Sequence, residues 1–318
     1  MKLLDRALRL LDQAKEWLEN AESGEILVAL VLLMTVIIVI HKTASPKSKK
    51  GRFTRIADKF KSLSDVTDAL REAGLESSNL LIGIDYTKSN EWTGKRSFAG
   101  RCLHHIDGSG RMLNPYQRVI RIIGETLASF DDDGEIPVFG FGDVTTGDRA
   151  VFSVNPARQD GVCFGLDDVL SKYTLVTPSV RLAGPTSFAP LIRRAVEIVR
   201  ESAQYHVLLI VADGQVTNPK ETADAIVEAS NFPLSIVMVG VGDGPWDTME
   251  TFDDELPARR FDNFQFVNFH QVMQQAQRKH GKRSELSLGE RQKRDFAVAA
   301  LQELPDQYLA IRQLDLMN

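Results

Sequence analysis

Cysteine is scarce in this chain of 318 residues. Cys102 and Cys163 are its only two thiols, and neither belongs to a C-x-x-C pair. Two isolated thiols cannot provide the four ligands of a structural zinc site, so these residues do not form a RING-type finger. They also cannot build a disulfide framework, and we expect both to be reduced and buried.

An excess of positive charge is also missing. The chain has 38 Lys and Arg against 43 Asp and Glu, a net charge of -5. A dedicated nucleic-acid-binding protein is usually basic, so we expect no nucleic-acid partner. Residues 140–143 and 240–244 are glycine-rich, but the first segment lacks the third glycine of a dinucleotide-binding loop, and Pro245 and Trp246 interrupt the second where the following helix would start. We therefore expect no nucleotide.

One long apolar run stands near the amino terminus. Residues 26–40 read ILVALVLLMTVIIVI, and a linker rich in Lys and Arg follows them over residues 43–56. The run is shorter than a typical membrane span, which has about 20 residues. It could instead be a buried core segment or the core of a signal peptide. Since a solvated basic linker follows, we predict a transmembrane helix over residues 26–42. The positive-inside rule then predicts a single-pass membrane protein with the carboxyl-terminal domain on the cytoplasmic side.

Two segments flank this run. Residues 1–25 have apolar positions at helical spacing, which indicates an amphipathic helix. It could lie on the membrane, pair with a second copy of the chain or extend the membrane helix, and the sequence does not separate these alternatives. The basic linker is expected to be attracted to anionic lipid headgroups.

Strand-like and helix-like segments alternate from Ser77 onward. We predict strands over residues 80–84, 136–141, 207–212, 234–241 and 265–267, and helices over residues 116–130, 166–173, 189–202, 220–230 and 270–279. This alternation predicts an α/β fold with a doubly wound, mostly parallel sheet flanked by helices. We assign residues 57–280 to this domain. Residues 281–318 would dock on it as a helix, residues 291–303, and a tail that is a short strand or an extended segment.

Polar residues follow the apolar segments where the carboxyl ends of parallel strands would bring them together. Asp85, Thr87 and Ser89 come directly after the first predicted strand, Thr186 precedes a predicted helix, and Asp213 follows the third predicted strand. Three hydroxyls and two carboxylates are hard oxygen donors, which suit magnesium or manganese. We therefore predict one Mg²⁺ or Mn²⁺ site.

In this order and spacing the set resembles the metal-ion-dependent adhesion site of von Willebrand factor A domains, D-x-S-x-S with a later Thr and a later Asp. Thr87 replaces the usual middle Ser and retains a hydroxyl, while Thr186 and Asp213 match the later residues. The resemblance implies that an acidic residue of a partner completes the metal's coordination. It also implies that ligand binding is coupled to a shift of the last helix, here residues 270–279.

The surrounding residues resemble more narrowly the A domains of copines and of plant RING-type ubiquitin ligases, over about residues 57–315. The resemblance is carried by IGIDYTKSNEWTGKRSF, LNPYQRVIRIIGETLASFDDDGEIPVFGFGD, VRLAGPTSFAPLI, ADGQVT and PLSIVMVGVGDGPWDTMETFDD. Copines place calcium-dependent lipid-binding domains before this module, and the plant ligases end in a RING finger. We expect neither here, so the resemblance does not extend to calcium-driven membrane recruitment or ubiquitin transfer.

We therefore expect a membrane-anchored, non-enzymatic module that binds a protein partner through its metal. One alternative is a metal-dependent phosphotransferase or phosphatase with Asp85 as the nucleophile. Lys88 is near in sequence, but no second acid accompanies Asp85 in its loop, as phosphoryl transfer would require. A second alternative, an adaptor without its own RING finger in a ubiquitin-ligase assembly, stays open.

Two other polar groups are expected to have ordinary roles. His104 and His105 lie in a loop with glycine and serine, where histidines are usually solvated. Asp143 follows a predicted strand, where we expect a turn residue rather than an outer-sphere neighbour of the metal.

Overall fold

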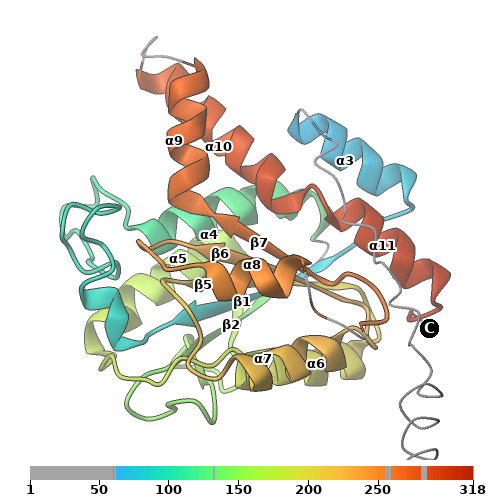
Figure 1. Cartoon of the computed structure of the whole chain (residues 1–318), viewed down its shortest axis with the longest axis horizontal. Helices are drawn as coiled ribbons and strands as arrows, with labels where there is room; N and C mark the ends of the chain where they lie inside the picture. Colours follow the sequence, from blue (N-terminus) through green and yellow to red (C-terminus); the bar gives the residue numbers. More distant parts are fainter. Residues whose placement is uncertain are drawn as a thin grey trace, which may run out of the picture. The chain divides into compact units, whose positions relative to one another are not determined.

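The computed structural model describes residues 60, 62–131, 133–254, 256, 259–280 and 285–317. The chain divides into two units, Met1–Phe53 and Thr54–Asn318, and all described residues belong to the second. Figure 1 shows a central sheet with helices on both of its faces. The predicted α/β fold with a mostly parallel sheet is thereby confirmed.

The predicted membrane attachment needs correction. Within the described ranges, no helix combines the length and the apolar character needed to cross a membrane. The prediction of a single-pass membrane protein with a cytoplasmic domain is therefore withdrawn. The segments on which it rested, the amphipathic residues 1–25, the apolar residues 26–42 and the linker 43–56, lie outside the described residues.

Seven strands of the described chain form one sheet, in the order β3-β2-β1-β5-β6-β7, with β4 also paired to β2. The parallel strands are β1 (Asn79–Asp85), β2 (Glu135–Phe141), β5 (His206–Ala212), β6 (Leu234–Gly240) and β7 (Phe264–Asn268). β2 lies on one side of β1, and β5, β6 and β7 lie on the other. The chain therefore adds strands in opposite directions from β1 and β5. At such a point, open α/β sheets form a crevice at the carboxyl ends of the strands.

Two hydrophobic clusters hold the helices on the sheet, because a parallel sheet buries both of its faces. One contains residues of α3 (Leu63–Glu72), α4 (Pro115–Leu127), α5 (Gly165–Val176), α9 (Phe269–His280), α10 (Glu285–Leu301) and α11 (Leu304–Gln313). The other contains residues of α6 (Ala189–Ser202), α7 (Pro219–Ala229) and α8 (Asp247–Asp254). In Figure 1, α3, α9 and α10 lie above the sheet, and α6 and α7 lie below it.

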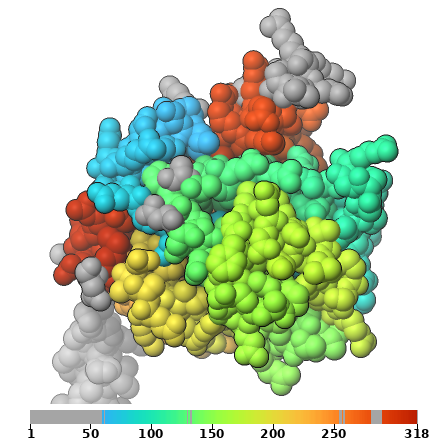
Figure 2. Space-filling model, turned by 180° about the vertical axis from the view of Figure 1, so that it is seen from behind, coloured from blue at the N-terminus to red at the C-terminus, as the bar shows by residue number. Residues whose placement is uncertain are grey.

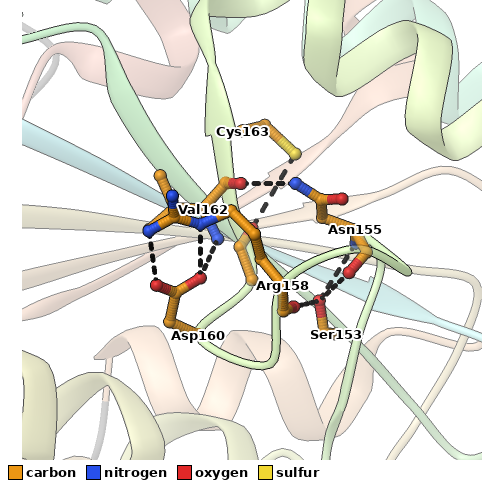
Figure 3. Close-up of polar contacts among 7 residues, drawn as sticks. Ser153, Asn155, Arg158, Asp160, Val162 and Cys163 are labelled. Atoms are coloured by element: carbon orange, nitrogen blue, oxygen red, sulfur yellow. Dashed lines mark hydrogen bonds and ion pairs between the residues drawn. The ribbon is translucent and has the colours of Figure 1, made fainter.

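Two short antiparallel strands, β3 (Phe152–Ser153) and β4 (Val162–Phe164), pair with β2 and were not predicted. Side chains shape the turn between them (Figure 3): Asn155 Nδ2 donates to the Val162 carbonyl at 2.6 Å, and the Arg158 guanidinium pairs with Asp160. Seen from behind, the α5 region (yellow-green) and the α6–α7 region (yellow) occupy much of that face (Figure 2). Strands of two and three residues give no periodic signal, which explains the omission.

The carboxyl-terminal tail differs from its prediction. Instead of a strand or an extended segment, it forms the helix α11, which packs on α3. Leu304, Tyr308 and Ile311 stand at helical spacing and are buried in the first cluster. The helices α3 and α8 were also missed, whereas all five predicted strands and the other predicted helices are present with small shifts at their ends.

Candidate metal site

Asp85, the last residue of β1, is fully buried at the carboxyl edge of the sheet. Its Oδ1 accepts the Thr87 N–H at 2.7 Å, and its Oδ2 is buried without a hydrogen-bond partner. Three donors converge on its backbone carbonyl: His104 Nε2 at 2.7 Å, Tyr116 Oη at 3.1 Å and Asn90 Nδ2 at 3.2 Å. The backbone of Asp85 is thus firmly held, while one of its carboxylate oxygens remains available to a ligand.

The loop after β1 joins Asp85 to the end of β5. The hydroxyls of Thr87 and Ser89 lie 3.0 Å apart, and Ser89 Oγ donates to Asp213 Oδ1 at 2.9 Å. Thr93 Oγ1 donates to the other oxygen of Asp213 at 2.5 Å. Because the Ser89 proton is directed to Asp213, the Thr87 hydroxyl donates to Ser89 Oγ, and one lone pair of the Ser89 oxygen stays free for a cation.

Thr186 lies at the same edge, in the loop that leads into α6. This loop touches the first one, since Lys88 N donates to the Ala183 carbonyl at 2.6 Å and Ala183 N donates to Tyr86 O at 3.3 Å. The backbone of Thr186 is paired with Thr217 in both directions. Within the described part of the chain, no hydrogen bond joins the Thr186 hydroxyl to the other four residues, although its side chain is buried.

The negative charges of Asp85 and Asp213 are destabilised, because both carboxylates are buried and close to each other. Burial raises the pKa of Asp85 well above its usual value, and the charge of Asp213 raises it further. Burial also raises the pKa of Asp213, against the lowering effect of its hydrogen bonds from Thr93 and Ser89. Among the described residues, no Lys, Arg or His forms an ion pair with either acid. A divalent cation would supply the missing positive charge, so the residues fit a metal.

The chemistry of the donors narrows the kind of metal. The described chain contains no group of three or more His, Cys, Asp or Glu side chains placed to hold a metal ion. The set at this edge has two carboxylates, and its other members are hydroxyls. Hard neutral oxygens with few charges favour a small cation that retains water rather than a thiolate or imidazole site for zinc.

His104 and two tyrosines form a layer of stacked rings beneath Asp85. The sequence did not predict this layer. The His104 ring stacks between Tyr86, at 4.5 Å between centroids, and Tyr116, at 4.1 Å. Burial lowers the pKa of His104 to about 4, so the ring is neutral near pH 7. Since a carbonyl only accepts, Nε2–H donates to Asp85 and Nδ1 accepts the hydroxyl of Tyr173 at 2.8 Å. The expectation that His104 is solvated was wrong.

Asp143 and the two cysteines lie outside the set of candidate ligands. Asp143 accepts from the Thr145 hydroxyl at 2.7 Å and from the Thr146 N–H at 2.9 Å, which confirms its role in a turn. Cys102 and Cys163 are free thiols, as predicted, but only Cys163 is fully buried. Asn90 and Thr93 were missed as members of the site, because their roles depend on contacts with Asp85 and Asp213 that the sequence does not reveal.

Comparison with known proteins confirms the resemblance to copines and plant ligases. Residues 102–318 match the protein family described as Copine. The E3 ubiquitin-protein ligase RGLG5 of Arabidopsis thaliana is 54% identical over 86% of this chain and 63% of its own length. Copine family protein 2 of Caenorhabditis elegans is 51% identical over 81% of this chain and 3% of its own length.

The ligase relatives correct one prediction. The protein was expected not to be an enzyme, and this is contradicted, because these relatives are named as ubiquitin-protein ligases, which are enzymes. The chain spans about three fifths of the length of such relatives, 63% for RGLG5 and 58% for RGLG2.

Among solved structures, the chain is similar to the manganese-loaded TRAP protein of Plasmodium vivax, with 11% identity and a TM-score of 0.39 over 62% of this chain and 70% of that one. It is also similar to proximal thread matrix protein 1 from the mussel byssus with a zinc-occupied MIDAS motif. There the identity is 14% and the TM-score 0.35, over 60% of this chain and 44% of that one.

Proposed function

The chain belongs to the copine family, and from that premise we propose that it binds a protein partner through one divalent metal, Mg²⁺ or Mn²⁺. The observation that carries this proposal is the buried Asp85 Oδ2, which has no hydrogen-bond partner and lies in the field of a second buried acid, Asp213. A buried carboxylate oxygen without a partner is costly unless something external binds to it.

The proposed ligands have different roles in holding the metal. Asp85 would neutralise part of the metal's charge, Thr87, Ser89 and Thr186 would offer hydroxyl oxygens, and Asp213 would bind directly or through water. When bound, the metal supplies a Lewis acid that attracts an anionic oxygen. A carboxylate of the partner is the side chain that best completes such a shell of hard oxygens.

The layer beneath the site supports this reading. His104 and Tyr116 fix the Asp85 carbonyl from within the core. Such outer contacts orient a metal ligand before the metal arrives and reduce the entropy lost on binding. The site therefore has the rigidity that selective binding of a small cation needs.

A second proposal concerns the setting in which the partner is bound. Relatives that are 54% and 52% identical to the chain are named as E3 ubiquitin-protein ligases. We propose that the chain acts in a ubiquitin-ligase activity and that its metal edge recognises a protein there. Phosphoryl transfer is disfavoured, because Lys88 Nζ binds the Glu91 carboxylate at 2.9 and 3.0 Å and its side chain is 56% exposed.

The test is affinity capture with the full chain from cell extract, in magnesium and in chelator, with bound proteins identified by mass spectrometry. We expect a set of proteins that is captured only with magnesium and is lost with Asp213→Asn. Asp160→Asn, which changes an acid in the exposed turn after β3, is the matched control and should retain the set. Capture that is equal in magnesium and chelator would contradict the metal-dependent proposal.

The ubiquitin-ligase setting has its own readout. Proteins captured in magnesium are incubated with ubiquitin, its activating enzyme and a panel of conjugating enzymes. We expect ubiquitin to be attached to at least one captured protein with the wild-type chain and not with Asp213→Asn. Equal modification with both chains would leave metal-dependent binding intact and contradict the link between this site and ubiquitin transfer.

A further inference from the structure

A pocket of about 500 Å³ opens beside the proposed metal site. One wall is the segment that carries Trp92, Thr93, Lys95 and Arg96, and the other is the turn of residues 243–245. Thr93 connects the pocket to the proposed metal site, because it lines the pocket and its hydroxyl donates to a carboxylate oxygen of Asp213. A partner segment bound at the metal would therefore continue directly into this pocket.

The two walls are bonded to each other. Asp243 Oδ2 accepts the Arg96 N–H at 2.8 Å, and its Oδ1 accepts the Ser97 N–H at 2.9 Å. In return, the Asp243 N–H donates to the Thr93 carbonyl at 2.8 Å. Two of these bonds join the Asp243 carboxylate to the backbone and the third joins backbone to backbone, so the pocket exists before a partner arrives.

The pocket carries an exposed aromatic side chain. Trp92 is 50% exposed. Few large apolar side chains in the described part of the chain are exposed to this extent. Exposed tryptophans that line a pocket are typical anchors of protein interfaces, because the indole buries a large area and retains a polar N–H. Pro245 adds a second apolar surface to the same pocket.

The charge of the pocket is opposite to that of the chain. Lys95 is exposed and forms no ion pair with the described residues, and the Arg96 side chain is 82% exposed. The one acid, Asp243, accepts two backbone N–H groups and has the Arg96 guanidinium at 3.9 Å. Two cations thus face one partly compensated anion, in a protein with a net charge of -5. This local excess complements an acidic segment.

We propose that this pocket recognises the segment that follows the metal-bound acid, and that the partner is an acidic peptide segment with an apolar residue beside that acid. The apolar residue packs on Trp92 and Pro245, and a further acid pairs with Lys95. This inference rests on the proposed function, since the metal-bound acid sets the register of the segment. The pocket provides specificity that a metal and a single carboxylate cannot provide alone.

The experiment is a selection from a random peptide library displayed on phage, with the full chain as bait in magnesium and elution by chelator. We expect enriched peptides to share an Asp or Glu followed by an apolar residue and a second acid. With one such synthetic peptide as probe, Trp92→Ala should weaken binding about 10-fold and Lys95→Ala less, while magnesium affinity stays unchanged. Leu175→Ala and Lys220→Ala, an exposed apolar and an exposed basic side chain that do not line this pocket, are the matched controls.

The outcomes separate this inference from the proposed function. Magnesium-dependent peptides that share only an acid, and that bind Trp92→Ala as well as wild type, would overturn the pocket's role and leave the metal-dependent function standing. A selection without any magnesium-dependent peptide would count against the proposed function, and the inference would fall with it. Loss of magnesium affinity in Trp92→Ala would show that the residue maintains the metal site instead.

Discussion

Buried acids occur in two regions of the molecule, and their charges are compensated differently. At the carboxyl edge of the sheet, Asp85 and Asp213 receive hydrogen bonds from hydroxyl and N–H groups, and pairing with a basic side chain is absent among their described neighbours, while Asp85 Oδ2 has no hydrogen-bond partner. At the start of α11, Glu303 lies near Asp253 and Asp262. In that second region an arginine, Arg259, is buried among the acids.

The region around Glu303 compensates its charges within the chain. The Arg259 guanidinium pairs with Asp262 at 2.8 Å and donates to the Asp253 carbonyl at 3.1 Å. Burial, with the charges of Asp253 and Asp262, raises the pKa of Glu303 to about 9, so a proton neutralises it at pH 7.

This difference in charge compensation indicates which of the two regions needs an external cation. Both regions bury acids, but of the two only the sheet edge lacks a basic side chain among its described neighbours. Asp85 Oδ2 there has neither a hydrogen bond nor an ion pair, whereas Asp262 Oδ1, which also lacks a hydrogen bond, pairs with Arg259 at 2.8 Å. A need for charge compensation that the chain does not meet indicates a ligand site, whereas an acid cluster with its own arginine indicates a structural one.

The largest effect is expected from Arg259→Ala. Removing the guanidinium leaves the Asp262 charge buried without its partner, so the free energy of unfolding should fall by about 3–5 kcal/mol. Urea unfolding measures it. The control is Arg158→Ala, which removes an even shorter but exposed pair with Asp160, at 2.6 Å, and should change stability far less. Similar losses in both variants would contradict a structural role for the Arg259 region.

Glu303→Gln should be stabilising, and its effect should depend on pH. The pKa of Glu303 is raised in the folded state, so the folded protein binds more protons than the unfolded one between about pH 4.5 and 9. Wild-type stability therefore falls as pH rises through this window, and the substitution removes that fall. We expect a gain of roughly 1–3 kcal/mol at pH 8 and little gain at pH 4. Urea unfolding at both pH values measures it, and a gain that is equal at both would contradict the assignment.

His104→Phe should weaken the metal site while retaining the ring stack. The substitution removes the donor to the Asp85 carbonyl, so magnesium affinity should fall about 10-fold. Titration calorimetry measures the affinity, and circular dichroism checks the fold. Tyr205→Phe is the control, because it removes another buried hydrogen bond, to Ser235 at 2.9 Å, away from the site. If both variants bind magnesium like wild type, His104 does not position Asp85.

The sequence predicted the fold well where long apolar segments mark the strands. β1 and β5 were identified because almost every residue in them is apolar, and this in turn located Asp85 and Asp213 at strand ends. The strands β3 and β4 were missed, since strands of two and three residues leave little periodic signal. The helix α11 was misassigned although Leu304, Tyr308 and Ile311 stand at helical spacing, because the last residues of the tail alternate between apolar and polar.

The site was only partly predictable for a different reason. Asp85, Thr87 and Ser89 are close in sequence, so their common direction could be predicted. The contact of Thr93 with Asp213 and the position of His104 under Asp85 depend on how distant loops pack. No local pattern encodes those contacts, and the histidine pair gave a misleading signal because burial depends on tertiary packing.

The measurement that tests the central claim most directly is a magnesium titration of the full chain by calorimetry, for wild type, Asp85→Asn and the control Asp160→Asn. We predict one site in wild type and in the control, and an affinity loss of more than about 100-fold in Asp85→Asn. Without metal, Asp85→Asn should melt at a higher temperature than wild type, because it removes a buried charge near Asp213. Equal magnesium uptake by wild type and Asp85→Asn would contradict the account.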